Sequence, residues 1–419
     1  MNTEDGESAA RLGVHLRHLA GRYYGPSLFS MTGATMLVPT LPVYLRDRAD
    51  SFTVITLVLA AAAFGGTAAN VPVGALVGRV GERIAFLGGL SIGAIGTAAV
   101  GFGTDGPLGL WLPFLCCAVA GVGSSARLVA HQSYARRTVA PAVRGRVMAV
   151  FGGLMRAALL IGPLLGGFLA QAIGFEATFV VAGAVMAVGL VPALIAGSGD
   201  DGRPPKAERP VRLGLGRLLA RHGRVIGLTG LGQFGAAVVR VGRLTVLPLY
   251  AAAIGLDVGQ IGVIVGLAGG LDLLLFPAAG WIMDRYGRLY AIIPSFLGLG
   301  IGLLLLPLAG DYRQLTAVSL IIGMANGIGS GTMLTLTTDL APKENPAEFI
   351  GTIRLLGDSG RILGPLVVGL VADRLDLASA SLVLGGVGVA TAALFVVAIG
   401  EPEHEVVDGP PPRAPSLPS

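Results

Sequence analysis

Eight charged side chains lie inside long apolar stretches of the chain, where they could pair with ions or exchange protons. Six are arginines and two are aspartates: Arg127, Arg156, Arg240, Arg243, Asp272, Arg354, Asp358 and Arg361. An ionised side chain at the centre of a lipid-exposed helix costs about 2.5–3.5 kcal/mol, so these groups should face protein or water. Guanidinium groups pair with carboxylates and phosphates, and a buried carboxyl group can exchange a proton.

The two aspartates differ in their neighbours. Asp358 has Arg354 four residues before it and Arg361 three residues after it, on one helical face. We expect Asp358 to stay ionised as a structural or gating partner of these cations. The residues three and four positions from Asp272 are all uncharged, and burial away from cations favours the neutral carboxyl group. We therefore predict that Asp272 carries a proton.

The remaining intramembrane cations predict a polar cavity. Arg156 lies about 13 Å along its apolar segment, on the same face as Pro163, and Arg240 shares a face with Gln233. Arg127 and Arg243 lie near the ends of their segments and could instead extend to lipid headgroups. We predict a substrate cavity lined by Arg156, Gln233, Arg240, Asp358 and Arg361. An excess of arginine favours an anionic solute, although each arginine could also serve a purely structural ion pair.

The composition of the chain that positions these residues is typical of a membrane protein. It is 53% hydrophobic and 13% charged, against about 25% charged residues in a soluble domain. Apolar stretches of about 20 residues, long enough to cross a bilayer as a helix, occur twelve times. They span roughly 23–45, 53–77, 84–104, 108–130, 147–172, 177–197, 225–250, 258–282, 289–309, 315–337, 350–373 and 377–399. The predicted fold is an all-α membrane protein with twelve transmembrane helices in two six-helix bundles.

The distribution of basic residues predicts the topology. With a cytoplasmic N-terminus, 20 of the 30 Lys and Arg residues lie on the inner side and four in outer loops, which is the positive-inside pattern. Both termini should then be cytoplasmic, in the cell membrane, and the preference for Arg over Lys hints at a bacterial source. We expect a cytoplasmic segment at 1–22, bundles at 23–197 and 225–399, a cytoplasmic linker at 198–224 and a cytoplasmic tail at 400–419.

The two halves of the chain are related by an internal repeat. The stretches "GALVGRVGER" at 74–83 and "GWIMDRYGRL" at 280–289 lie 206 residues apart, and "LPVY" recurs as "LPLY" at the same interval. The pair Gly162-Pro163 recurs at an interval of 202 as Gly364-Pro365. Duplication of a six-helix half is typical of transporters.

At these residues the chain resembles the major facilitator superfamily, in particular its twelve-helix proton-coupled exporters. The family's turn Gly-x-x-x-Asp-Arg-x-Gly-Arg is matched by Gly280, Asp284, Arg285, Gly287 and Arg288, and less fully by Gly74, Arg79, Gly81 and Arg83, with Gly78 and Glu82 as departures. "GPLLGG", containing Gly162, Pro163, Gly166 and Gly167, is similar to the family's antiporter motif. The arginine of the family's fourth-span motif is replaced by Cys117. The resemblance implies that these residues control gating.

The resemblance also gives the turn's aspartate a role. It implies that Asp284 contacts the start of the fifth span near Arg144 and Arg146, where a helix N-terminus favours an anion. Gly78 offers no charge for the mirror contact. We therefore expect that Asp284 holds the two halves together on one side only. The alternative is that the position is dispensable and that the difference between Gly78 and Asp284 arose by drift.

The predicted function is proton-coupled antiport, exporting a small amphipathic compound by alternating access. Uptake of an organic solute by the same fold is the first alternative, and a multi-pass membrane enzyme or receptor is the alternative from another class. The chain has no nucleophile–base cluster or metal-ligand spacing, so we expect no enzyme activity, metal or cofactor. The expected partners are a small-molecule substrate, protons and lipid, without nucleic acid, and the protein should act as a monomer.

Overall fold

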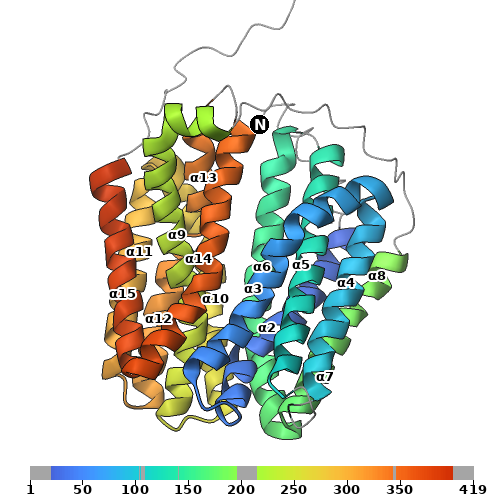
Figure 1. Cartoon of the computed structure of the whole chain (residues 1–419), viewed down its shortest axis with the longest axis vertical. Coiled ribbons are helices and arrows are strands. Elements are labelled where there is room, and N and C mark those ends of the chain that lie inside the picture. Colours follow the sequence, from blue (N-terminus) through green and yellow to red (C-terminus); the bar gives the residue numbers. More distant parts are fainter. Residues whose placement is uncertain are drawn as a thin grey trace, which may run out of the picture.

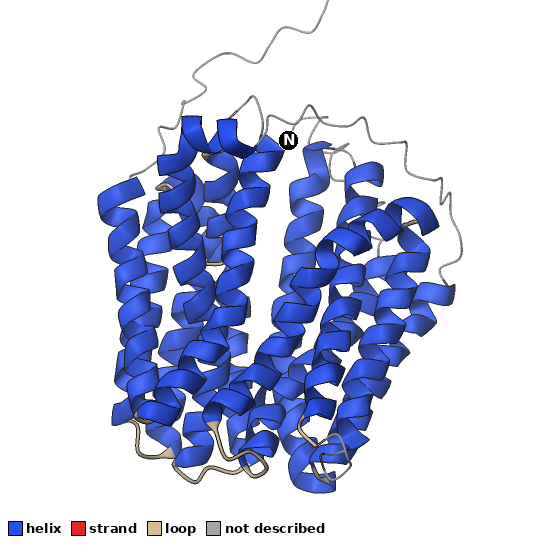
Figure 2. Ribbon diagram, viewed as in Figure 1, coloured by secondary structure: helices blue, strands red, loops and turns tan. Residues whose placement is uncertain are grey.

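The computed structural model describes residues 20–102, 104, 109–139, 141–195, 215–342 and 346–399. In this part of the chain the regular structure is entirely helical (Figure 2). Twelve helices are long and apolar enough to cross a membrane. The prediction of a twelve-span, all-α protein is therefore confirmed. The predicted N-terminal segment, most of the linker and the tail lie outside the described residues.

The first bundle contains the helices that precede the linker. They are η1 (Ala20–Tyr24), α2 (Gly25–Arg46), α3 (Phe52–Val80), α4 (Glu82–Ala99), η2 (Val100–Phe102), α5 (Trp111–Thr138), α6 (Pro141–Ile173), α7 (Phe175–Val188) and α8 (Leu190–Ile195). The π-helical turn η1 continues into α2, and α7 with α8 forms the sixth span.

The second bundle repeats this order. Its elements are α9 (Leu215–Ala253), α10 (Val258–Arg285), α11 (Leu289–Leu305), η3 (Leu306–Leu308), α12 (Tyr312–Ile328), α13 (Thr332–Asp339), α14 (Pro346–Arg374), α15 (Leu377–Leu394) and η4 (Phe395–Ile399). Helix α9 begins ten residues before the predicted span at 225, with non-helical backbone angles at His222. Part of the predicted linker thus belongs to the seventh span.

The tenth span is not the continuous helix that its hydropathy predicts. Helix α12 ends at Ile328 and α13 begins at Thr332. Between them Gly331 has a φ of +79°, a conformation that strains residues with a side chain. The interruption places non-helical backbone and the Ser330 hydroxyl inside the protein, because Ser330 is buried.

The two bundles lie side by side and meet through a subset of their helices (Figure 1). Helix α6 packs along α10, and α14 packs along α3. Helices α4, α7, α11 and α15 pack extensively within their own bundles. These four helices belong to the third, sixth, ninth and twelfth spans, and within the described residues none of them packs along a helix of the other bundle.

Glycines allow α6 and α10 to approach closely. A Cβ atom at Gly262 would lie 2.5 Å from the Pro163 carbonyl oxygen, and one at Gly269 would lie 2.5 Å from that of Leu159. Small residues at helix contacts let backbones pack tightly in membranes, where dispersion replaces the hydrophobic effect. The antiporter-like motif takes part, because Gly166 meets Met36 of α2 and Gly167 meets Val258 of α10.

Candidate functional site

Asp272 of α10 lies at the centre of a buried polar cluster that joins the two bundles. One oxygen, Oδ2, accepts a hydrogen bond from Asn326 Nδ2 at 2.7 Å. The other, Oδ1, accepts from Ser330 Oγ at 3.0 Å and from Arg156 Nε at 3.1 Å. Asn326 and Ser330 come from the interrupted tenth span, whereas Arg156 comes from α6 of the first bundle. The Arg156–Asp272 ion pair therefore spans the interface between bundles.

Arg156 is held from several sides. Its Nε also donates to Ser330 Oγ at 3.2 Å, and its Nη1 donates to the Gly152 carbonyl at 2.9 Å. Its guanidinium carbon lies 4.1 Å from the ring centroid of Phe276, which is within cation–π range. The Arg156 side chain is 15% exposed and that of Asp272 is 3% exposed, so the pair is shielded from water.

The prediction that Asp272 lacks a cationic neighbour is wrong. It considered only residues on the same helix, and those are uncharged. The cation is supplied by Arg156, 116 residues away in sequence and on another helix. Asp272 remains a candidate proton carrier only if this ion pair separates during the transport cycle.

Two further arginines of the second bundle lie near this cluster, one partly buried (Arg240) and one buried (Arg243). Arg240 donates from Nη2 to the Gly329 carbonyl at 2.7 Å, and its guanidinium carbon lies 5.0 Å from the Phe296 ring centroid. Arg243 is 7% exposed, and its side chain therefore does not extend to lipid headgroups. Within the described residues neither has an ion-pair partner inside 4 Å. The region thus holds three guanidinium groups and one carboxylate.

The other predicted cavity residues lie elsewhere. Gln233 packs against α14, since a Cβ atom at Gly357 would lie 2.7 Å from its Cγ. Asp358 and Arg361 line a cavity between α3, α5 and α14 that shares no residue with the Asp272 cluster. The structure therefore divides the predicted cavity residues between two regions of the bundle interface.

The duplicated turns share a glycine with positive φ but carry opposite charges at the residue that follows it, Glu82 in the first and Arg288 in the second. Gly81 and Gly287 occupy equivalent positions and both have positive φ, +89° and +111°. Gly74 and Gly280 do not mediate close helix approach, because an added Cβ atom would meet nothing within 4 Å. Arg79 and Arg285 are exposed. We call this end of the molecule, with its exposed Arg79 and Arg285, the Arg-rich end.

The departure at Glu82 is explained by this inversion. Arg288 donates from Nε to Asp339 Oδ2 at 2.8 Å and thus ties its turn to the end of the tenth span. At the equivalent positions of the first bundle, Glu82 accepts from Ser133 Oγ at 2.8 Å. Glu82 also accepts from Arg137 Nη2 at 2.8 Å. Each turn is thus fixed to the end of a span that follows it in the chain, the fourth or the tenth, with donor and acceptor exchanged.

This inversion predicts a rescue. Glu82→Arg should destabilise the protein by about 1.5–3 kcal/mol, since it removes charged hydrogen bonds and faces Arg137. Adding Ser133→Asp recreates the arrangement of Arg288 with Asp339 and should recover part of the loss. Thermal unfolding of the purified variants in detergent measures both effects. A double variant no more stable than the single one would contradict the equivalence.

The predicted contact of Asp284 with the fifth span is not seen with Arg146. Asp284 instead accepts from Arg288 Nη1 at 3.3 Å, four residues on, and its side chain is 81% exposed. Arg146 is exposed, and the side chain of Arg144 lies outside the described residues. The latch through Asp284 therefore stays a prediction for another conformation.

A cross-bundle contact that sequence reasoning missed lies at the opposite end of the molecule. Asp373, in the last turn of α14, accepts from Ser51 Oγ and from the backbone N–H groups of Phe52 and Thr53 at 2.5, 2.6 and 2.9 Å. Ser51 is the N-cap residue of α3 and makes no side-chain cap of its own. The second bundle thus supplies the N-terminal cap of a helix in the first.

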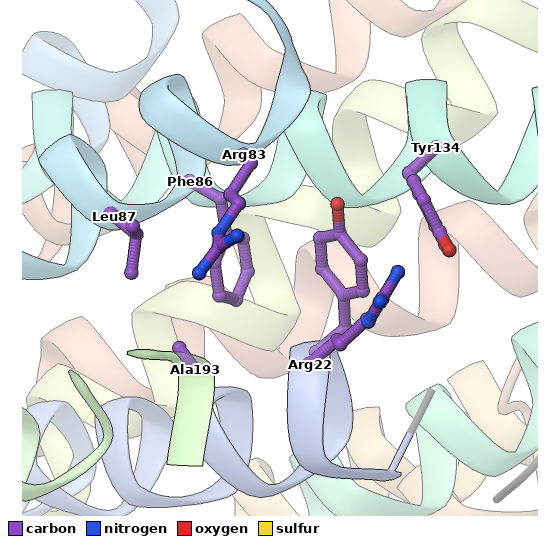
Figure 3. Close-up of a pocket in the computed structure, with 7 residues that line it drawn as sticks. Arg22, Arg83, Phe86, Leu87, Tyr134 and Ala193 are labelled. Carbon is purple, nitrogen blue, oxygen red and sulfur yellow. The ribbon is translucent and has the colours of Figure 1, made fainter. Parts of the chain in front are cut away.

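A small pocket at the Arg-rich end is too confined to hold a substrate. It has a volume of about 10 Å³, which is room for about one water molecule. Figure 3 shows that its walls combine two arginines with aromatic and aliphatic side chains; the lining residues are Arg22, Tyr23, Arg83, Phe86, Leu87, Tyr134 and Ala193. The substrate site is therefore to be sought between the bundles.

Two repeated six-helix bundles with charged groups buried between them define a secondary transporter. The family model for the Major Facilitator Superfamily matches residues 27–364 and 229–418, and the chain belongs to this family. The resemblance seen in the sequence is thereby confirmed, as is the expectation that the protein is a transporter and not an enzyme.

Known proteins share this architecture at low sequence identity. An uncharacterized MFS-type transporter of Methanocaldococcus jannaschii is 24% identical over 84% of this chain and 90% of its own length. Multidrug resistance protein MdtG of Serratia proteamaculans is 28% identical, over 34% of this chain and about a third (35%) of its own length. A solved POT family transporter in complex with 5-aminolevulinic acid superposes with a TM-score of 0.71 at 15% identity, covering 89% of this chain and 94% of its own. The nucleoside transporter NupG also gives 0.71, at 14% identity, with 90% and 98% covered.

Proposed function

We propose that the protein is a proton-coupled antiporter that exports a small organic anion through the cell membrane. The observation that carries this proposal is the Arg156–Asp272 ion pair, which is buried and joins the two bundles. An anionic group entering between the bundles competes with Asp272 for Arg156, since guanidinium binds carboxylate and phosphate alike. The surplus of arginine around Asp272 favours such an anion.

Release from Arg156 changes what Asp272 can do. A buried carboxylate without its cation is costly, and protonation removes the charge while Asn326 and Ser330 remain as hydrogen-bond partners. Proton and substrate thus exclude each other: the proton is bound by Asp272 when the substrate holds Arg156, and it leaves when the ion pair forms again. This exclusion is what antiport requires.

The orientation follows from the basic residues. We place the Arg-rich end in the cytoplasm with both termini, according to the positive-inside rule, in a bacterial cell membrane. The bundles are joined by Asp373 at the opposite end, and their ribbons diverge toward the Arg-rich end (Figure 1). The conformation is then inward-facing. Export is favoured over uptake by the similarity to MdtG, whose name denotes multidrug resistance, and a monomer suffices because each chain carries both bundles.

Flux measurements in proteoliposomes test the proposal. Full-length protein is reconstituted, a pH gradient is imposed, and a panel of radiolabelled organic acids, neutral solutes and cations is offered. We expect at least one acid to move against its gradient in the direction opposite to the protons, and an ionophore that collapses the pH gradient to abolish this movement. Movement in the same direction as the protons would indicate uptake instead. Flux that does not respond to the pH gradient would refute proton coupling.

A further inference from the structure

The cavity between α3, α5 and α14 has two chemically different walls. Its volume is about 80 Å³. One wall belongs to the second bundle and carries Arg354, Asp358 and Arg361. The other belongs to the first bundle and carries the hydroxyl and amide groups of Thr67, Asn70, Ser124 and Ser125. A ligand in this cavity therefore contacts both bundles at once.

On the charged wall, neither arginine makes a direct hydrogen bond to a carboxylate within the described residues. Arg361 Nη1 lies 3.9 Å from Asp358 Oδ1, which is too long for a direct hydrogen bond. Within the described residues, Arg354 has no carboxylate within 4 Å. Two guanidinium groups and one carboxylate leave a net charge of +1 on this wall. The wall is suited to a ligand with one negative charge.

The neutral wall is partly organised for hydrogen bonding. Ser125 donates its hydroxyl to Asn70 Oδ1 at 2.7 Å. This bond fixes the Asn70 amide and leaves its Nδ2 group available as a donor. Thr67 and Ser124 add two hydroxyl groups that can both donate and accept. The wall thus offers a ligand several polar partners, whereas Leu128 is the largest apolar residue of the lining.

The size of the cavity limits the ligand. One water molecule needs about 10–15 Å³ by this measure, so the cavity of about 80 Å³ holds the equivalent of a few waters. Sites for drug-sized ligands are about 300–1,000 Å³. A small solute, or the polar head of a larger one, matches these dimensions.

We propose that this cavity selects a small hydroxylated organic acid, with its carboxylate on Arg354 and Arg361 and its hydroxyl groups on Asn70, Ser124 and Asp358. The inference rests on the proposed function, since it names the substrate class of that transporter. The cavity shares no residue with the Asp272 cluster, so it is a separate site, which the acid occupies before or after its carboxylate binds Arg156. Asp358 acts as an acceptor for ligand hydroxyl groups and is repelled by a second negative charge. A hydrophobic cation is disfavoured in this cavity, because the charged wall has a net positive charge and the other wall carries hydroxyl and amide groups.

Four probes of matched size separate the features of this site. They are glycerate, with a carboxylate and two hydroxyls; propionate, with the carboxylate alone; glycerol, with hydroxyls and no charge; and 3-amino-1,2-propanediol, a hydroxylated cation. Binding to the purified full-length protein is measured by saturation-transfer NMR and by competition. We expect glycerate to bind at least about tenfold more tightly than each of the others, which corresponds to about 1.4 kcal/mol. Equal or tighter binding of the cation or of propionate would overturn the assignment.

Variants locate the binding to this cavity. Arg354→Gln and Arg361→Gln should each weaken glycerate binding by about tenfold or more, whereas Arg313→Gln, an exposed arginine outside the cavity, should leave it unchanged. Asp358→Asn removes a negative charge and should strengthen propionate binding severalfold, a change that misfolding cannot produce. Glycerate binding that is insensitive to Arg354 and Arg361 would refute the site.

The result can be separated from the proposed function. Glycerate binding that depends on Arg354 and Arg361, without flux driven by a pH gradient, would refute proton coupling and leave this site standing. Proton-driven flux of a cation, without glycerate binding, would support coupling and overturn the substrate class.

Discussion

Asp272→Asn is expected to reduce transport driven by a pH gradient to the level of protein-free vesicles, while exchange of labelled for unlabelled substrate continues. Asparagine keeps the shape of the side chain and can still bond Asn326 and Ser330, but it cannot take up a proton. Arg156 loses its counter-ion and becomes permanently available to an anion, so substrate binding should persist or strengthen. Both fluxes are measured on the same proteoliposome preparation.

The control for this variant is Asp311→Asn. Asp311 caps the N-terminus of α12 by accepting from the Gln314 N–H at 2.8 Å, and asparagine caps helices about equally well. It should therefore retain both fluxes. Equal loss of driven flux and exchange in Asp272→Asn would mean that the aspartate serves structure and not coupling.

Asp373→Ala is expected to open the end of the molecule opposite the Arg-rich end. The substitution removes a cap that one bundle provides for the other. An N-terminal cap contributes about 0.5–2 kcal/mol, so the ratio of closed to open conformations at this end should fall by about tenfold. Spin labels at positions 50 and 375, in loops beside the contact, should show a larger population at long distances.

Asp376→Ala is the matched control for this experiment. Asp376 accepts from the Ser379 N–H at 2.6 Å and caps α15 within its own bundle. This N–H holds the pKa of the Asp376 carboxyl below its usual value, so the cap is complete at neutral pH and is lost only as the pH falls through that lowered pKa. Asp376→Ala should remove a helix cap of similar strength without changing the distances between the spin labels. Identical distance distributions in the two variants would rule out the Asp373 contact as a latch.

The fold could be predicted from the sequence because hydropathy and length determine membrane spans almost independently of tertiary structure. The repeated turns could be predicted for a similar local reason, since Gly81 and Gly287 adopt a backbone conformation that favours glycine. The break in the tenth span had a signal in "GIGSG" at 327–331, where three glycines occur within five residues. Hydropathy alone could not detect it, because glycine is common in transmembrane helices.

The site was only partly predictable because its contacts depend on the alignment of helices that are distant in sequence. The types of residue, an aspartate and several arginines within spans, were evident. The pairing of Asp272 with Arg156 depends on how α10 lies along α6, which the intervening glycines determine. The contact of Asp373 could not be predicted, because an acidic residue at the end of a span looks like any loop residue in the sequence. Its role is evident only from the structure, where the N-terminus of α3 lies beside it.

Infrared difference spectroscopy of the carboxyl groups is the most direct test of the claim that Asp272 takes up a proton when an anion binds Arg156. The spectrum of the reconstituted protein is recorded before and after addition of a transported acid. We predict a new C=O stretch of a protonated carboxyl group on substrate binding in the unmodified protein and its loss in Asp272→Asn. A band that persists in Asp272→Asn, or its absence from the unmodified protein, would contradict the mechanism.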